Sequence, residues 1–193
     1  IESDRLAPFN PRGSDVAVVL DLMIHDIDLV RTLVGGPVAG LSAVGIPVLT
    51  PFVDIANARL EFASGAVANI TASRVSRDRT RKLRIFQKSG YLSLDLAAGH
   101  GEYYRLRTDV DFAELAKSAT SVEAFVEHVP LEAPEGEPLR LEFESFLQAV
   151  RGEAPVMVSG EDGREALAVA LRIVGEIERT LPALKGVGVF PSA

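Results

Sequence analysis

The sequence predicts an α+β domain in which helices cover one face of an open, mostly antiparallel β-sheet. Three features indicate this class: a long apolar segment of helical length near the start, a series of short alternating segments joined by tight turns, and two helical segments at the end. Runs of strands and helices that are segregated along a chain are typical of this layout. We expect the uncovered face of the sheet to be a place where subunits meet.

The first expected elements are a strand and a long helix. Residues 1–6 alternate between apolar and polar side chains, and the following loop is rich in proline and glycine. Ser14 and Asp15 are good N-cap residues for a helix that continues, largely apolar, to Val34, and Gly35-Gly36-Pro37 predicts its end. The chain starts without methionine and already within a strand pattern, so we expect a piece of a longer protein; trimming of a dispensable tail would explain the same start.

The middle of the chain predicts the body of the sheet. Ser64-Gly65 and Lys88-Ser89-Gly90 are turns so short that they join only antiparallel neighbours. Two further strands are expected after residue 100, and the pattern between them, at residues 109–121, assigns no element. The expected strands are residues 38–48, 54–63, 66–75, 82–87, 91–96, 103–108 and 122–131.

Two helices are expected after the sheet. Apolar residues at helical spacing predict one helix from Glu137 to Val150, after a turn-rich linker. Ser159 and Asp162 have the spacing of a capping box, which predicts a second helix that ends near Leu181, before Pro182.

The composition restricts the class of protein. The 193 residues carry 27 acidic and 20 basic side chains, for a formal net charge of -7, so nucleic acid is not an expected partner. The absence of cysteine excludes disulfides and thiolate metal sites, and it leaves the cytoplasm as the expected compartment. No apolar run approaches the roughly 18 to 20 residues that cross a bilayer, so no membrane association is expected. A single globular domain is the expectation for this length.

Asp21 and His25 are the strongest candidates for chemistry. Residues four apart on a helix lie on one face, so the carboxylate can reach the imidazole. An anionic neighbour favours imidazolium and burial disfavours it, and this balance suits a histidine that takes up and returns a proton. An ordinary helix salt bridge, or a histidine satisfied within a packed helix, explains the same spacing.

The same helix face also has a spacing that could suit a metal site. Asp21, His25 and Asp28 fall at intervals of four and three, as three ligands of a divalent cation would. No second histidine cluster supports them, so no metal is expected, and Asp28 with Arg31 is more simply a surface ion pair.

Polar residues near the start of the helix are candidates for binding. Arg5, Asn10 and Arg12 flank the helix entry, where they could contact an anion or a sugar hydroxyl, although solvated loop residues would look the same. The basic run from Arg74 to Arg84 is expected to be a solvated strand edge or a subunit contact. No glycine-rich loop lies between a strand and a helix, as a dinucleotide cradle requires, and no Gly-x-Ser-x-Gly nucleophile motif is present.

Three segments carry a resemblance to a known family. Leu20 to Leu29, which reads Leu-Asp-Leu-Met-Ile-His-Asp-Ile-Asp-Leu, resembles the signature helix of the glucose-fructose oxidoreductase, inositol dehydrogenase and MocA family. The second segment is the hairpin from Phe62 to Ala68, which is also similar to that family. The third lies near the end and consists of Glu142 to Leu147 together with the run from Pro155 to Gly163. In this order the segments cover nearly the whole chain.

The resemblance implies that residues 1–193 are a C-terminal substrate-binding and oligomerisation domain. The family's N-terminal Rossmann half, which would bind NAD or NADP and carry a catalytic lysine in a Glu-Lys-Pro motif, has no counterpart in this chain. The family pattern makes the histidine matching His25 the acid/base for a sugar hydroxyl, with the aspartate matching Asp21 orienting it.

We therefore expect an NAD(P)-dependent dehydrogenase that acts on a hydroxyl of a sugar, nucleotide sugar or cyclic polyol. The chain alone is expected to be inactive, and the whole protein is expected to be a homo-oligomer through the sheet face. The alternative is a non-catalytic dimerisation or ligand-binding module that retains the fold.

Overall fold

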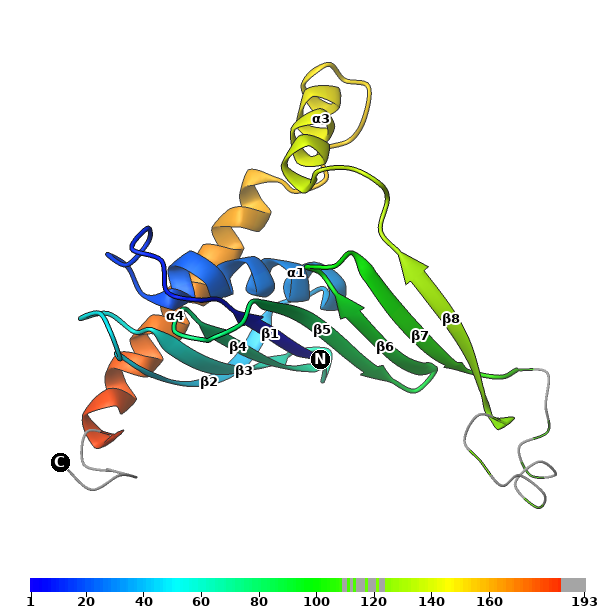
Figure 1. Ribbon diagram of the computed structural model, residues 1–193, viewed down its shortest axis with the longest axis horizontal. Helices are drawn as coiled ribbons and strands as arrows, with labels where there is room; N and C mark the ends of the chain where they lie inside the picture. The colour runs from blue at the N-terminus through cyan, green and yellow to red at the C-terminus, as the bar shows by residue number, and fades with distance from the viewer. Residues whose placement is uncertain (109–110, 112, 114–116, 118–120, 122–123, 185–193) are drawn as a thin grey trace.

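One continuous sheet of eight strands forms the centre of the molecule (Figure 1). The computed structural model describes all residues except 109–110, 112, 114–116, 118–120, 122–123 and 185–193. The strands are β1 (Glu2–Leu6), β2 (Val38–Ile46), β3 (Ile55–Phe62), β4 (Val67–Ser73), β5 (Thr80–Gln87), β6 (Gly90–Asp95), β7 (His100–Leu106) and β8 (Val126–Glu132). They lie in the order β2-β3-β4-β1-β5-β6-β7-β8.

The predicted strands are confirmed, with shifts of a few residues at their ends. Residues 122 and 123, where the last strand was expected to begin, lie outside the described residues, as does much of the unassigned segment before them. All neighbouring pairs of described strands are antiparallel except β1 and β4. The α+β class with an open, mostly antiparallel sheet is confirmed.

The first strand lies in the middle of the sheet, between β4 and β5. Leu6 at its end pairs with Ser73, the last residue of the parallel strand β4, and with Thr80, the first residue of the antiparallel strand β5. Three strand ends therefore meet where the chain leaves β1. Because strand pairing of this kind joins residues far apart in sequence, the local pattern around Leu6 could not show it.

The first helix begins later than predicted. Residues Val19–Met23 form a π-helical turn, η1, which leads directly into α1 (Ile24–Val34). Ser14 does not cap this helix, because its hydroxyl donates to the Pro11 carbonyl at 2.7 Å within the preceding loop, and the described N-cap, Val18, has no side-chain cap. The expected capping by Ser14 and Asp15 is therefore wrong. The Val18 amide donates to the Val53 carbonyl at 2.8 Å, and the helical turn η1 begins at the next residue.

Two more helices follow the sheet, α3 (Pro138–Val150) and α4 (Gly160–Leu184). The capping box is confirmed: the Asp162 amide donates to the Ser159 hydroxyl at 3.2 Å, and the Asp162 carboxylate accepts the Ser159 amide at 2.8 Å. The predicted end at Leu181 is wrong, because the helix continues through Pro182 to Leu184. A proline this close to the end of a helix removes only one of its last hydrogen bonds. No helix among the described residues is long and apolar enough to cross a membrane.

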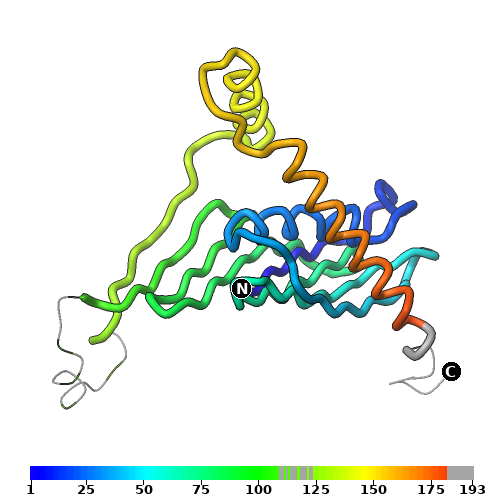
Figure 2. The backbone as a smooth tube through the Cα atoms, turned by 180° about the vertical axis from the view of Figure 1, so that it is seen from behind, coloured from blue at the N-terminus to red at the C-terminus, as the bar shows by residue number. Residues whose placement is uncertain are grey.

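The hydrophobic core lies between one face of the sheet and the helices η1, α1 and α4. Alternate residues of β3 show the division clearly: Ala56, Ala58, Leu60 and Phe62 are buried, whereas the residues between them are exposed. Figure 2 shows α4 crossing α1 and β2 obliquely, and these pairs of elements are in contact. Burial of each large side chain here contributes about 1.5–3 kcal/mol, so this layer fixes α1 on the sheet.

Helix α3 departs from the expected layout. It stands away from the sheet (Figure 1), and none of its residues is buried. Its apolar side chains Leu139, Phe143, Phe146 and Val150 are all more than half exposed. The expectation of helices packed on one face therefore holds for α1 and α4 and is wrong for α3.

Among the described residues, no helix lies on the opposite face of the sheet, and we call it the free face. An aromatic row crosses four of its strands: the rings of Phe86 and Tyr91 have centroids 5.0 Å apart, those of Tyr91 and Tyr104 6.2 Å, and those of Tyr104 and His128 4.7 Å. Phe86 is 57% exposed. The rest of this face is largely polar, with ion pairs such as Arg84–Glu2 at 2.9 Å.

Candidate functional site

A polar cavity of about 530 Å³ opens where β1 leaves the sheet, and we call it the site cavity. It lies where the ends of β1 and β4 meet the start of β5, beside η1 and the first turn of α1. All five residues that the sequence singled out, Asp21, His25, Arg5, Asn10 and Arg12, line it. Its full lining is Arg5, Leu6, Ala7, Pro8, Asn10, Arg12, Asp21, Leu22, His25, Arg74, Arg79 and Arg81.

Asp21 and His25 face the same cavity from the junction of two helix types. Asp21 lies within the π-helical turn and His25 in the first turn of α1, so the spacing of four residues still brings both to one side. π-turns occur frequently at functional sites. Among the hydrogen bonds of the described residues, none joins the two side chains, and His25 is exposed. Both groups are therefore open to a ligand in the cavity.

Gly13 sets the position of the Asp21 carboxylate. Its backbone has φ of +77°, in the left-handed region that favours glycine, and a Cβ at this position would come within 2.7 Å of Asp21 Oδ1. The carboxylate thus packs directly on the Gly13 backbone. No pattern around Gly13 indicated this contact, because it joins a loop to a helix turn.

A buried ion pair fixes α1 to the central strand. The Arg5 guanidinium donates to both oxygens of Asp26, the residue after His25, and the Ser3 hydroxyl donates to Asp26 Oδ1 at 2.9 Å. Arg5 and Asp26 side chains are only 12% and 2% exposed. The pairing holds the first turn of α1, and His25 with it, against β1. Arg5 lines the site cavity, but its charge is already paired with Asp26.

Arg74 secures the loop that precedes η1. Its guanidinium donates to the Gly13 carbonyl at 2.6 Å and to the Val16 carbonyl at 2.7 Å, and it lies 3.7 Å from the Asp54 carboxylate. Both charged residues are buried. Arg74 therefore ties the Gly13 loop to the end of β4, and a residue expected to be solvated is part of the framework of the site.

Asp54 organises the other side of this framework. Its carboxylate accepts the backbone amides of residues 48, 49 and 50 at 2.7–2.9 Å and the Thr50 hydroxyl at 2.8 Å. Burial raises the pKa of Asp54, but these hydrogen bonds outweigh burial and hold the pKa below its ordinary value. Asp54 is therefore an ionised anchor beneath Arg74.

Arg79 and Arg81 enter the site cavity from the start of β5. The sequence-based expectation for the run from Arg74 to Arg84, a solvated edge or a subunit contact, is wrong for Arg74, which is buried. Arg79 and Arg81 are exposed, as expected, and they also line the cavity. Arg81 lies directly opposite Arg5 on the neighbouring strand. Partial burial, together with the positive charges of Arg5 and Arg79, lowers the pKa of Arg81, against the opposing effect of Asp26. Only the strand register, which sequence did not reveal, could have placed them here.

Asp28 is not part of the site. It does not line the cavity, and its Oδ1 atom is buried without a hydrogen-bond partner. The expected surface pair with Arg31 is wrong, because Arg31 instead lies 3.9 Å from Glu165 and donates to the Asp162 carbonyl at 3.2 Å. Among the described residues, no group of three or more histidine, aspartate and glutamate side chains is placed to hold a metal ion.

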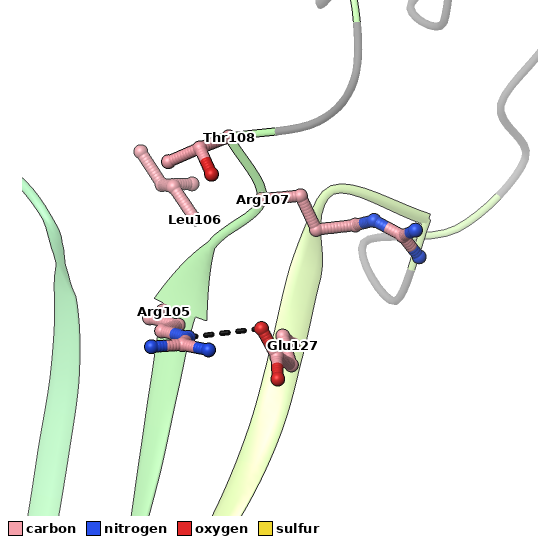
Figure 3. A pocket seen from close by; sticks show the side chains of 5 residues that line it. All are labelled: Arg105, Leu106, Arg107, Thr108 and Glu127. Atoms are coloured by element: carbon pink, nitrogen blue, oxygen red, sulfur yellow. Dashed lines mark hydrogen bonds and ion pairs between the residues drawn. The ribbon is translucent and has the colours of Figure 1, made fainter.

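A second cavity, of about 470 Å³, lies at the end of β7 (Figure 3). Arg105 on β7 and Glu127 on the neighbouring strand β8 face each other there, and Arg105 Nε donates to Glu127 Oε2 at 2.9 Å. Both side chains are about half exposed. An exposed, satisfied ion pair has no group poised for chemistry, so the site cavity is the candidate site.

Comparisons with known proteins match both the sequence and the fold. The sequence profile described as GFO/IDH/MocA C-terminal domain matches residues 6–93. UDP-N-acetylglucosamine 3-dehydrogenase from Acidithiobacillus ferrooxidans is 35% identical over 183 residues, which are 94% of this chain and 55% of that protein. A solved structure of that enzyme matches with a TM-score of 0.80 at 34% identity, over 93% of this chain and 55% of the solved chain.

A more distant structure matches in fold alone. Levoglucosan dehydrogenase, solved with NADH and levoglucosan, has a TM-score of 0.72 at 15% identity, over 92% of this chain and 56% of the solved chain. The fold is thus that of a domain found in sugar dehydrogenases. The chain is therefore similar to the C-terminal domain of the GFO/IDH/MocA family, in sequence over residues 6–93 and in fold over 93% of its length. It spans about half the length of the curated relative that it matches.

Proposed function

We propose that this chain is the substrate-binding half of an NAD(P)-dependent dehydrogenase that oxidises a hydroxyl of a sugar, with a nucleotide sugar as the favoured substrate. The observation that carries the proposal is the convergence of Asp21 and His25 on one polar cavity, at the end of the central strand. The 35% identity to a nucleotide-sugar dehydrogenase over 94% of the chain supports the substrate class.

In this proposal His25 is the acid/base and Asp21 its positioning partner. The exposed imidazole takes the proton of the substrate hydroxyl while the hydrogen on the same carbon leaves as hydride, so that the alcohol becomes a carbonyl. In the reverse direction His25 returns the proton. The Asp21 carboxylate, held against Gly13, favours the imidazolium that forms. Asn10 and the cavity arginines bind the substrate's other oxygens.

A nicotinamide cofactor, when bound, accepts the hydride from the substrate carbon. The residues of this chain fit the reacting end of such a site and not a diphosphate cradle. Among the described residues, the passage from β1 into η1 carries Pro8 and Pro11, where a cradle would need closely spaced glycines. We therefore propose that a cofactor-binding domain belongs to the whole protein and precedes this one, and that the chain alone neither binds NAD(P) tightly nor turns over.

The proposal is tested by replacing His25 in the protein that includes the cofactor-binding half. His25→Asn is expected to lower turnover of the sugar by a factor of about 10² to 10⁴, with cofactor affinity little changed, because general acid/base help is lost. Steady-state kinetics with fluorescence titration of the cofactor would measure both.

His100→Asn is the matched control, because His100 is exposed at the start of β7 and belongs neither to the site cavity nor to the aromatic row. It should retain the wild-type turnover. If His25→Asn turned over at the wild-type rate, the proposed role of His25 would be wrong, and a non-catalytic binding module would be the better description.

We also propose that the free face meets a second copy of this domain. The aromatic row on that face is continuous over four strands; its ends, Phe86 and His128, are exposed in the single chain, and Tyr91 and Tyr104 are partly exposed. Exposed apolar patches rimmed by polar residues are typical of protein interfaces.

A further inference from the structure

The site cavity carries more positive charge than the handling of a neutral hydroxyl requires. Five arginines and one aspartate line it. Arg5 is neutralised by Asp26, and Arg74 lies against Asp54, so these two belong to the framework. For the side chains of Arg12, Arg79 and Arg81, the hydrogen bonds and ion pairs within the described residues include no partner. Three guanidinium groups of the cavity are therefore available to bind a ligand.

The strand register explains why this charge is costly to the protein. Arg81 is directly opposite Arg5, and side chains in such cross-strand positions lie only about 4.5–5.5 Å apart at Cβ. Like charges at this distance destabilise the sheet. Arg79 adds a further positive charge nearby, and the pKa of Arg81 is lowered by partial burial first and then by the charges of Arg5 and Arg79. A feature that opposes folding is expected where it serves binding.

The local charge is also opposite to that of the whole chain. The formal net charge of -7 would repel an anionic ligand, whereas a cluster of arginines at the mouth of one cavity attracts it locally. Guanidinium groups bind phosphate oxygens through paired hydrogen bonds, which makes arginine the preferred partner of phosphate groups. The cavity volume of about 530 Å³ is within the range of small-molecule sites.

We propose that Arg12, Arg79 and Arg81 form a subsite for a phosphate or diphosphate group of the molecule that occupies the site cavity. This inference rests on the proposed function, because it assigns the recognition of that molecule to the cavity that contains His25. His25 and Asp21 handle the reacting hydroxyl, and the three arginines hold the charged end of the ligand. A neutral sugar would leave them without a partner.

Calorimetry on this chain with sodium pyrophosphate tests the subsite directly. The wild-type chain is expected to bind pyrophosphate, more weakly as salt is raised, and Arg79→Gln combined with Arg81→Gln should weaken binding by at least about tenfold. Arg59→Gln is the matched control: Arg59 is an exposed arginine of β3, 3.6 Å from Glu61, and should leave the affinity unchanged. Urea denaturation of each variant would verify that it is folded.

Two further titrations show which molecule supplies the phosphate. If UDP binds and loses affinity in the double variant, the group belongs to the substrate; if NADP does so instead, it belongs to the cofactor. The proposed subsite would be wrong if the wild-type chain did not bind pyrophosphate, or if the wild type and the double variant bound it equally well.

The two proposals can fail separately. If His25→Asn loses turnover but pyrophosphate binding does not depend on the arginines, the proposed subsite is wrong and the proposed dehydrogenase function stands. If pyrophosphate binding depends on the arginines but His25→Asn has unchanged turnover, the proposed role of His25 is wrong and the proposed subsite stands.

Discussion

Gly13 is the residue on which the position of the Asp21 carboxylate depends. A methyl group at this position would lie 2.7 Å from Asp21 Oδ1, well inside van der Waals contact, so any side chain must push the carboxylate away. The positive φ adds a backbone cost that is independent of Asp21. The two effects can be separated by comparison with a second glycine.

Gly13→Ala is expected to cost about 1–2 kcal/mol in free energy of unfolding and, in the proposed dehydrogenase that includes a cofactor-binding half, to lower turnover. Gly65→Ala is the control: Gly65 has a φ of +86° and no atom within 4 Å of the added Cβ. It should lose similar stability with turnover unchanged. Equal turnover in the two variants would show that the position of Asp21 does not matter for the reaction.

At the scale of elements, Asp54 holds the connection between β2 and β3 and lies beneath Arg74. Its pKa is below 3.8, the ordinary value for aspartate, so the unfolded chain binds the proton more readily than the folded chain. The carboxylate therefore contributes its full stability above pH 3.8. That contribution is lost as the pH falls below 3.8 towards the lowered pKa of the folded state.

Asp54→Asn should reduce the free energy of unfolding by about 3 kcal/mol at pH 7, because four hydrogen bonds and the charge opposite Arg74 are weakened. The difference from wild type should stay constant down to about pH 5 and shrink below pH 4. Urea denaturation across this range measures it, with the exposed Asp78→Asn as control. A difference that does not change with pH would contradict the ionised state of Asp54.

Local sequence pattern predicted most elements because each has its own periodicity and its own turn or cap. The hairpin turn at Ser64-Gly65 and the capping box at Ser159 are examples. The start of the first helix was missed, since it depends on the bond from Val18 to Val53, which is distant in sequence. The exposed position of α3 was missed because its apolar spacing indicates a buried face, and no part of the chain that the structure describes covers that face.

Some residues of the candidate site could likewise be predicted from the sequence, and others could not. Asp21, His25, Arg5, Asn10 and Arg12 were recognisable because they lie in one short stretch of sequence around one helix start. Arg79 and Arg81 reach the same cavity only through the pairing of β5 with β1, about 75 residues later. Sequence spacing carries no information about such a pairing.

At the scale of the whole molecule, the free face should determine the oligomeric state. Tyr104 lies in the centre of the aromatic row, between Tyr91 and His128. Tyr104→Lys would replace the central ring of the row by a charged side chain and should convert the assembly to monomers in sedimentation velocity experiments. Leu139→Lys, on the exposed face of α3, is the comparison, and it should leave the assembly intact. A monomeric wild type, or an unaffected Tyr104→Lys, would argue against this interface.

The proposed reaction depends on Asp21 and His25 acting as one unit. Groups that serve a single proton transfer are not additive, since removal of the acid/base leaves its positioning partner with nothing to position.

A double-mutant cycle on turnover tests this most directly, with Asp21→Asn, His25→Asn and the combined variant in the protein that includes the cofactor-binding half. Each single change should lower turnover, and the combined variant should be no slower than His25→Asn alone, within about threefold. Losses that multiply in the combined variant would show that the two residues act independently, which would contradict the proposed pair.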